Sequence, residues 1–229
     1  MHASPRRDFL GRLGAAVTGL AGRSAFAPVP GESPPPEPRR QPLPTSPWDR
    51  SWVDRLKHAS YRVVFDANEV GDGLAVDLAA MFMDQFRGVY GTRDEETRAV
   101  IVARQLGAPL AFGDSLWARY EIGVETHVSD PMTHAPARRN PFWSAPAGSP
   151  RAHDASTLEA LLGRGVTLLI CNIAAMNWAA RLAQKRERDV EETRNQVRNG
   201  LVPGAILVPS GIFALIRAQN AGCAFVRGA

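Results

Sequence analysis

The feature that most constrains this chain is a regular alternation of short apolar strands and helical segments after residue 60. Five runs rich in β-branched, aromatic or small apolar residues predict strands at 61–66, 97–103, 166–171, 204–208 and 223–226. Helical spacing and capping residues predict intervening helices at 74–91, 114–120, 157–162, 174–185, 189–200 and 212–220, with a short one within 48–60. Strands and helices that alternate in this way form a mostly parallel sheet covered on both faces. We therefore expect a three-layer α/β sandwich with five strands.

The first 27 residues have the pattern of an export signal. The pair Arg6-Arg7 is followed by Asp8-Phe9-Leu10, a Gly/Ala-rich apolar stretch and the small-x-small end Ala25-Phe26-Ala27. This pattern is typical of a leader read by the twin-arginine translocase. The apolar stretch is about half as long as a membrane-spanning helix requires. We expect export to the periplasm or another compartment outside the cytoplasm; whether the leader is cleaved or kept as an anchor stays open.

Residues 28–47 are dense in proline and nearly free of large apolar side chains, which predicts an extended, disordered tether before a folded domain at 48–229. The whole chain has 27 Lys+Arg and 23 Asp+Glu, but the leader alone holds four arginines and one aspartate. The remainder is therefore almost neutral, and the basic pI of the whole chain, which comes mostly from the leader, gives no support for nucleic-acid binding. Phosphate-binding loops, dinucleotide fingerprints and Cys-x-x-Cys pairs are absent from the sequence, so no cofactor is expected.

Three polar positions follow predicted strands and are candidates for a site. Asp66 ends the first strand, Cys171-Asn172 ends the third, and Ser210 follows the fourth at the start of a helix. In open parallel sheets, binding and catalytic residues gather at the carboxyl ends of the strands. Cys171 also precedes a helix, whose amino-terminal amides favour a thiolate. A reactive thiol and a buried structural thiol both fit this position.

The two cysteines are not expected to form a disulfide within the chain. Cys223 begins the fifth strand and belongs at the opposite end of the sheet from Cys171. Disulfides require Cα atoms within about 7 Å, whereas strands of five or six residues are about 17–20 Å long. We expect Cys223 to be a packed, small apolar side chain.

Residues 123–155 are rich in Pro, His, Asp and Ser, have no sustained periodicity, and predict a long irregular excursion. Within it, His127, Asp130 and His134 lie close together in sequence. Imidazole and carboxylate ligands suit a divalent metal, although the spacing matches no known motif. Solvated loop residues are the alternative.

Several segments together resemble the DsrE/DsrF-like family, and most closely an exported branch that carries a twin-arginine leader. They are PLAFGDSLW (109–117), the run from Asp130 to Phe142, GVTLLICN (165–172), LVPGAILVPSGI (201–212) and RAQNAGCAF (217–225). The resemblance spans roughly residues 61–227. It implies a flavodoxin-like five-stranded α/β fold, a tendency to form homo-oligomers, and sulfur transfer through a cysteine at the junction of the third strand and its helix, where Cys171 stands.

Three functions remain open on these grounds. In the first, Cys171 carries a persulfide, Asn172 and Ser210 or nearby backbone amides hold its sulfur anion, and a small sulfur compound is the expected ligand. In the second, the sheet edge and the excursion form a non-catalytic module that binds a small ligand or a metal. In the third, the chain is an oligomeric structural or partner protein.

Overall fold

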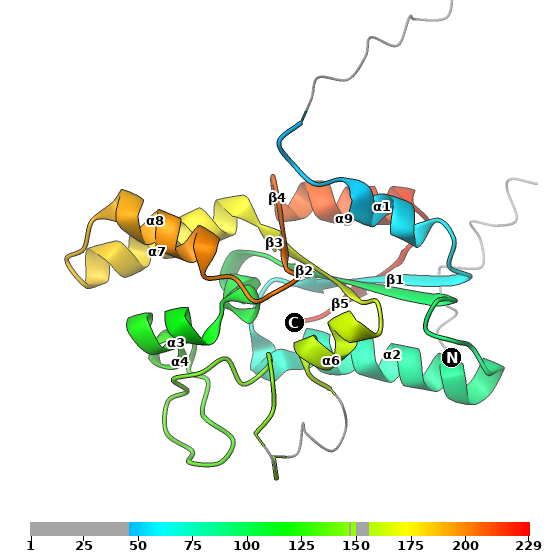
Figure 1. Ribbon diagram of the computed structural model, residues 1–229, viewed down its shortest axis with the longest axis horizontal. Coiled ribbons are helices and arrows are strands. Elements are labelled where there is room, and N and C mark those ends of the chain that lie inside the picture. Colours follow the sequence, from blue (N-terminus) through cyan, green and yellow to red (C-terminus); the bar gives the residue numbers. More distant parts are fainter. Residues whose placement is uncertain (1–45, 147, 150–155) are drawn as a thin grey trace, which may run out of the picture. The chain divides into compact units, whose positions relative to one another are not determined.

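The computed structural model (Figure 1) describes residues 46–146, 148–149 and 156–229. The predicted leader (1–27) and nearly all of the predicted tether (28–47) lie outside the described residues. Within the described part of the chain, no helix combines the length and apolar character needed to cross a membrane.

The centre of the domain is a five-stranded, entirely parallel sheet in the order β4-β3-β2-β1-β5. The predicted strands are confirmed, and their ends shift by no more than a residue or two. Their bounds are Tyr61–Ala67 (β1), Thr97–Ala103 (β2), Thr167–Cys171 (β3), Ile206–Val208 (β4) and Ala224–Arg227 (β5). The three central strands are buried over almost their whole length, as expected for a parallel sheet covered on both faces.

Helices cover both faces of the sheet, and the handedness of the connections explains which face each helix takes. The chain steps in one direction from β1 to β4 and then returns to place β5 beside β1. Because such crossovers are right-handed, the last connection lies on the face opposite to the earlier ones. The helices among the described residues are α1 (Ser51–Leu56), α2 (Leu74–Tyr90), α3 (Asp114–Tyr120), α4 (Ile122–Thr126), α6 (Leu158–Gly163), α7 (Asn172–Lys185), α8 (Val190–Asn199) and α9 (Gly211–Asn220), with 3-10 segments η1 (Gly71–Gly73) and η2 (Gln105–Ala111).

The core is accordingly divided into two apolar layers. The larger layer joins one face of the sheet to α2, α3, α6, α7 and α8 and includes Met83, Trp117, Leu161 and Trp178. The smaller layer joins the other face to α1 and α9 and includes Trp52, Leu56 and Leu215. The architecture is thus the flavodoxin-like α/β sandwich expected from the sequence, with a sheet that is parallel throughout.

The excursion predicted at 123–155 is irregular for most of its described length but is attached firmly to the core. Its first residues, contrary to expectation, continue the short helix α4. Asn140 is 2% exposed, and its side-chain amide donates to the carbonyls of Leu110 and Phe112 at 2.9 and 2.7 Å. Phe142 packs edge-on against Trp117. These contacts hold the middle of the excursion against the larger part of the core, next to α3.

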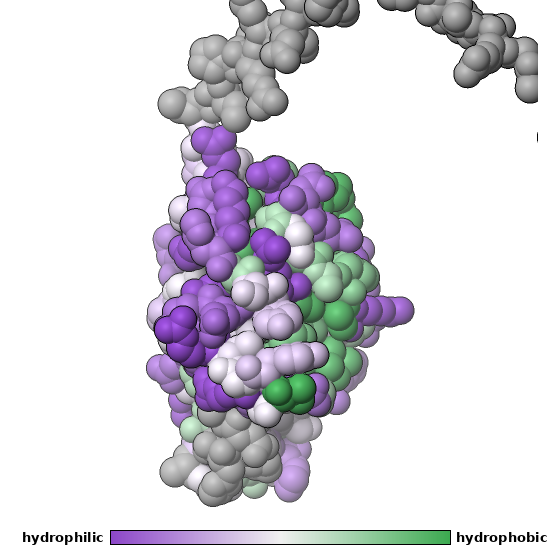
Figure 2. Space-filling view, turned by 90° about the vertical axis from the view of Figure 1, so that its right-hand side faces the viewer, coloured by the Kyte–Doolittle hydropathy of each residue, from purple (hydrophilic) through white to green (hydrophobic). Residues whose placement is uncertain are grey.

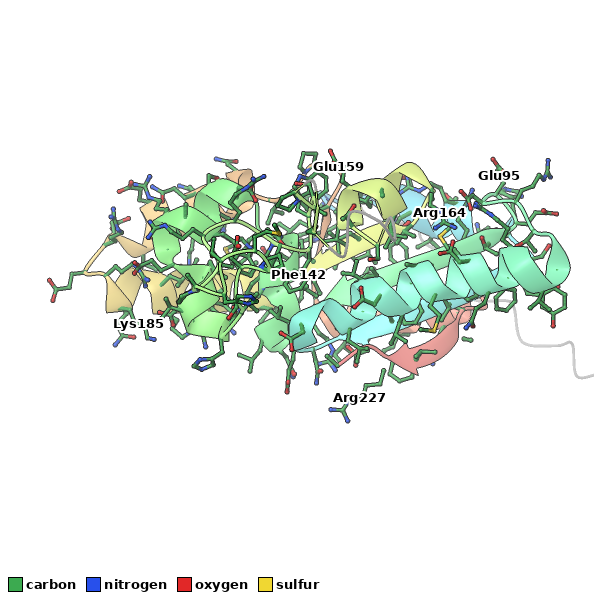
Figure 3. The ribbon with its side chains drawn as sticks, turned by 90° about the horizontal axis from the view of Figure 1, so that it is seen from below. Glu95, Phe142, Glu159, Arg164, Lys185 and Arg227 are labelled. Atoms are coloured by element: carbon green, nitrogen blue, oxygen red, sulfur yellow. The ribbon has the colours of Figure 1, made fainter. Side chains whose placement is uncertain are left out.

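The β5 edge of the sheet carries exposed apolar side chains. All four residues of β5 are exposed, among them Phe225 and Val226. The neighbouring helix α2 exposes Leu74 and Met81. Figure 2 shows apolar side chains gathered along one side of the domain, and in Figure 3 β5 lies beside α2 with Arg227 projecting away from the sheet.

Candidate functional site

Cys171 lies where β3 ends and α7 begins, as the sequence predicted. It is the N-cap residue of α7, and its Sγ accepts the backbone amide of Ala174 at 3.4 Å. Helices are usually capped by a hydroxyl or carboxylate oxygen. Here a cysteine sulfur takes that position and faces the free backbone amides of the first turn. The residue is 6% exposed and borders the larger core layer. A negative charge on this sulfur would face the amino-terminal end of a 14-residue helix.

A buried ion pair lies next to this thiol. Arg104, the residue after β2, donates from Nε and Nη2 to the two carboxylate oxygens of Asp66 at 2.6 and 2.7 Å. The Asp66 and Arg104 side chains are 9% and 15% exposed. The hydrogen bond to Asp66 raises the pKa of Arg104; partial burial opposes this, and negative charge on Asp66 and then on Cys171 adds to it. Ala103 and Ile170 are paired across β2 and β3, so Arg104 and Cys171 follow them side by side at the same end of the sheet.

The start of α9 completes this end of the sheet. Ser210 is the N-cap of α9, and its Oγ accepts the amide of Phe213 at 3.1 Å. A Cβ on Gly211 would lie 2.6 Å from Cδ of Arg104 and 2.7 Å from its Cβ. Glycine at this position lets the helix start approach the arginine side chain, which keeps the guanidinium directed at Asp66. Asn172, the first residue of α7, is partly exposed beside the thiol.

The structure thus brings together the residues predicted at the carboxyl ends of the strands: Asp66, Cys171, Asn172 and Ser210. Two of them have structural duties, because Ser210 caps a helix and Asp66 is held by Arg104. Cys171 also caps a helix, but its sulfur is the nucleophilic atom of the set; it lies at the start of α7 and near a cation, in a residue that is 6% exposed. Such a sulfur is suited to nucleophilic attack and to carrying an anionic adduct.

Arg104 was not among the residues predicted for the site. A signal was nevertheless present, since Arg104 directly follows the buried strand β2 and so lies at the same edge of the sheet as Asp66 and Cys171. Its partner Asp66 is 38 residues away in the chain, so no local sequence pattern links the two residues.

Cys223 is a useful contrast within the same molecule. Both cysteines are free, and Cys223 precedes β5 at the opposite end of the sheet from Cys171, as expected. Its 7% exposure matches that of Cys171. Burial raises the pKa of the Cys223 thiol to about 11, with a smaller opposing effect from Arg62. This cysteine is a packed, neutral side chain.

The three residues considered as metal ligands do not come together. In the described part of the chain, no group of three or more His, Cys, Asp or Glu side chains is arranged to hold a metal ion. Asp130 instead closes a turn, and hydrogen bonds from the amides of Thr133 and Met132 lower its pKa. His127 ends α4, and the amide of His134 donates to the backbone of Asp130. The proximity of these residues in sequence reflects a turn.

Comparisons with known proteins leave the family open. No protein-family model matches the chain, and a search of characterised proteins gives no match either. A solved structure similar to this one is described as "Structure of Protein of Unknown Function MTH1491 from Methanobacterium thermoautotrophicum". The two share 18% sequence identity with a TM-score of 0.36, and the match covers 73% of this chain and 98% of the other.

Proposed function

We propose that this chain is a sulfur carrier that accepts sulfane sulfur on Cys171. The observation that carries the proposal is the position of Sγ, which caps α7 through Ala174 and lies near the Arg104 guanidinium. A persulfide formed there has its negative charge next to a helix amino terminus and a cation, and both stabilise anions. The resemblance of this chain to DsrE/DsrF-like proteins points to the same residue.

The proposed reaction is a thiol–persulfide exchange. The Cys171 thiolate attacks the terminal sulfur of a donor persulfide, R–S–S⁻, and a new S–S bond forms to Sγ. The S–S bond of the donor breaks, its electron pair leaves with R–S⁻, and Cys171 carries one additional sulfur. The exchange needs no external oxidant or reductant. A second thiolate regenerates Cys171 by the same step in reverse.

The burial of Cys171 restricts the donor. Cys171 as a whole residue is only 6% exposed, so a bulky side chain of a partner protein is not expected to reach its sulfur. We therefore propose an inorganic polysulfide or a low-molecular-weight persulfide as the immediate donor.

The test is to measure cyanide-labile sulfur after the purified protein has been treated with polysulfide and desalted. Cyanide removes the outer sulfur of a persulfide as thiocyanate, so each loaded site yields one thiocyanate. The proposal predicts one thiocyanate per chain for the wild type and for Cys223→Ser, and none for Cys171→Ser. Equal yields from the two single variants would reject Cys171 as the acceptor.

We also propose that the chain works outside the cytoplasm, after export by the twin-arginine translocase. The support is the sequence pattern around Arg6-Arg7, which lies outside the described residues. Replacing both arginines with lysine is expected to leave the protein in the cytoplasmic fraction. Unchanged export of that variant would contradict the assignment.

The last part of the proposal is a homo-oligomer that buries the β5 edge. An edge strand with exposed Phe225 and Val226 offers both free backbone groups and apolar surface to a second copy. Sedimentation velocity is expected to show an assembly that Phe225→Lys dissociates. A monomeric wild-type protein at micromolar concentration would contradict this part and leave the sulfur chemistry unaffected.

A further inference from the structure

Two adjoining clefts run along α7 beside the segment that follows β2, and they share Leu106, Trp178 and Arg181. Their volumes are about 310 and 390 Å³, in the range of small-molecule sites. The first cleft is also lined by Gln105, Ala174 and Asn177. The second is also lined by Glu69, Val70, Gly71, Glu125, Thr126 and His127.

Arg181 is a cation that the described residues leave unneutralised at the junction of the clefts. Its guanidinium carbon lies 3.7 Å from the centroid of the Trp178 ring, and its buried Nε has no hydrogen-bond partner among the described residues. No carboxylate in the described part of the chain lies within ion-pair distance of it, whereas Arg104, Arg164 and Arg186 are each paired with an acid. Charged groups in partly buried positions normally have partners, so an unpaired guanidinium that lines both clefts indicates a ligand that supplies the counter-charge.

The arrangement around Arg181 is fixed before any ligand binds. The indole Nε1 of Trp178 donates to the carbonyl of Gln105 at 2.9 Å, which sets the plane of the ring. The ring in turn supports the guanidinium through a cation–π contact. A guanidinium held in this way loses little side-chain entropy on binding, which favours affinity.

The lining residues define the charge of the ligand. No acidic side chain lines the first cleft; two side-chain amides and two apolar side chains lie there with Arg181 and Trp178. The second cleft contains Glu69, which repels a second negative charge, and Glu125, whose own charge is paired with Lys185 and Arg186. A single guanidinium matches a carboxylate in a two-point hydrogen bond, while the apolar surface of Leu106 and Trp178 suits an aliphatic chain.

We infer that these clefts bind a small aliphatic monocarboxylate, with its carboxylate on Arg181 and its chain along Leu106 and Trp178. The site is separate from the sulfur chemistry, since no step at Cys171 is required for it. It lies close to that chemistry, because Ala174 lines the first cleft and also donates its amide to Cys171 Sγ.

The experiment is calorimetric titration of the purified full-length protein with hexanoate, with hexanamide as an uncharged ligand of the same length. Arg181→Gln removes the charge. Arg119→Gln is the matched control, because Arg119 lines a different cleft with Leu116 and Gln196. Cys171→Ser separates this inference from the proposed sulfur chemistry. Circular dichroism checks that each variant is folded, and Asn177→Ala provides a second variant in the first cleft should Arg181→Gln fail to fold.

The inference predicts saturable binding of hexanoate by wild type, Arg119→Gln and Cys171→Ser, with affinity reduced about tenfold or more in Arg181→Gln. Asn177→Ala is expected to bind hexanoate more weakly than wild type, and hexanamide is expected to bind at least about tenfold more weakly than hexanoate. No binding of hexanoate at millimolar concentration, or equal affinity in wild type and Arg181→Gln, would overturn the inference. If Asn177→Ala is measured in place of Arg181→Gln, equal affinity of wild type and Asn177→Ala for hexanoate would also overturn the inference. Loss of binding in Arg119→Gln would overturn it as well, by placing the site elsewhere.

Discussion

Cys171 and Cys223 are buried to nearly the same degree at opposite ends of one sheet, with exposed fractions of 6% and 7%. They differ in what surrounds the sulfur. Cys171 accepts an amide at the start of α7 and lies near Arg104, whereas burial dominates at Cys223 and raises the pKa of its thiol to about 11. The chain therefore contains its own control for how the surroundings of a buried cysteine affect the reactivity of its thiol.

The first prediction concerns alkylation of the folded protein at pH 8. Iodoacetamide is expected to modify Cys171 at least about tenfold faster than Cys223, because the nucleophile is the thiolate and Cys223 stays almost wholly protonated. Peptide mass spectrometry of quenched time points gives both rates in one sample. In denaturant the two rates are expected to converge. Equal rates in the folded protein would contradict the prediction.

The second prediction concerns the ion pair between Asp66 and Arg104. Either single substitution, Asp66→Asn or Arg104→Gln, is expected to lower the free energy of unfolding by roughly 3 kcal/mol, since each leaves a buried polar group without its partner. The double variant should cost less than the sum of the two, and urea unfolding of all four proteins measures the coupling. Asp54→Asn breaks an exposed pair with Lys57 and serves as the control with no measurable effect. Additive costs in the cycle would show that the pair is not coupled.

The third prediction concerns pH and Glu125, whose side chain is 10% exposed and contacts Lys185 and Arg186 at 2.6 and 3.5 Å. Burial alone would raise its pKa, but the hydrogen bonds and charges of the two bases outweigh this and lower it below 4.5. The stabilisation is complete above the pKa of the unfolded chain and is lost as pH falls through the lower folded value. Glu125→Gln is therefore expected to cost roughly 1–2 kcal/mol at pH 7.

At pH 3 the cost of Glu125→Gln is expected to be smaller than at pH 7. Thermal unfolding of wild type and variant at both values tests this, with Glu159→Gln, a substitution of an exposed residue in α6, as the control. A difference between wild type and Glu125→Gln that does not change with pH would contradict the assignment of the two bases as the cause.

The fourth prediction concerns the anchor of the excursion. Asn140→Ala removes two side-chain hydrogen bonds to the carbonyls of Leu110 and Phe112 and is expected to cost roughly 2–3 kcal/mol. Met132→Ala, in the exposed part of the same excursion, is the control. Limited proteolysis should then cut the excursion faster in Asn140→Ala alone. Comparable stability of the two variants would mean that Asn140 does not anchor the segment.

The fold could be predicted from the sequence because its strands are short, dense apolar runs. Such runs are readily distinguished from the helical segments, whose apolar residues recur every three or four positions. The run ending in Cys171 and the helix capped by Asp189 both appear where their residue types placed them. Helix α7 starts two residues earlier than predicted, at Asn172, because Cys171 takes the capping role that the sequence pattern does not assign to cysteine.

The site was only partly predictable, since its contacts join residues far apart in the chain. The edge of the sheet shared by Asp66, Cys171 and Ser210 follows from strand polarity alone, and the structure confirms it. Arg104 pairs with Asp66, and the side-chain amide of Asn140 donates hydrogen bonds to the carbonyls of Leu110 and Phe112. Neither interaction produces a periodic pattern in the sequence, so neither could be predicted from it. The set of His127, Asp130 and His134 looked like a metal site because turn residues and metal ligands are of the same chemical types.

The most direct measurement of the central claim is site-resolved sulfur transfer in the wild-type protein. The folded chain is treated with polysulfide, persulfides are trapped with iodoacetamide, and peptides containing Cys171 and Cys223 are compared by mass spectrometry. The account predicts one additional sulfur atom on the Cys171 peptide and none on the Cys223 peptide. Additional sulfur on both peptides alike, or on Cys223 alone, would contradict it.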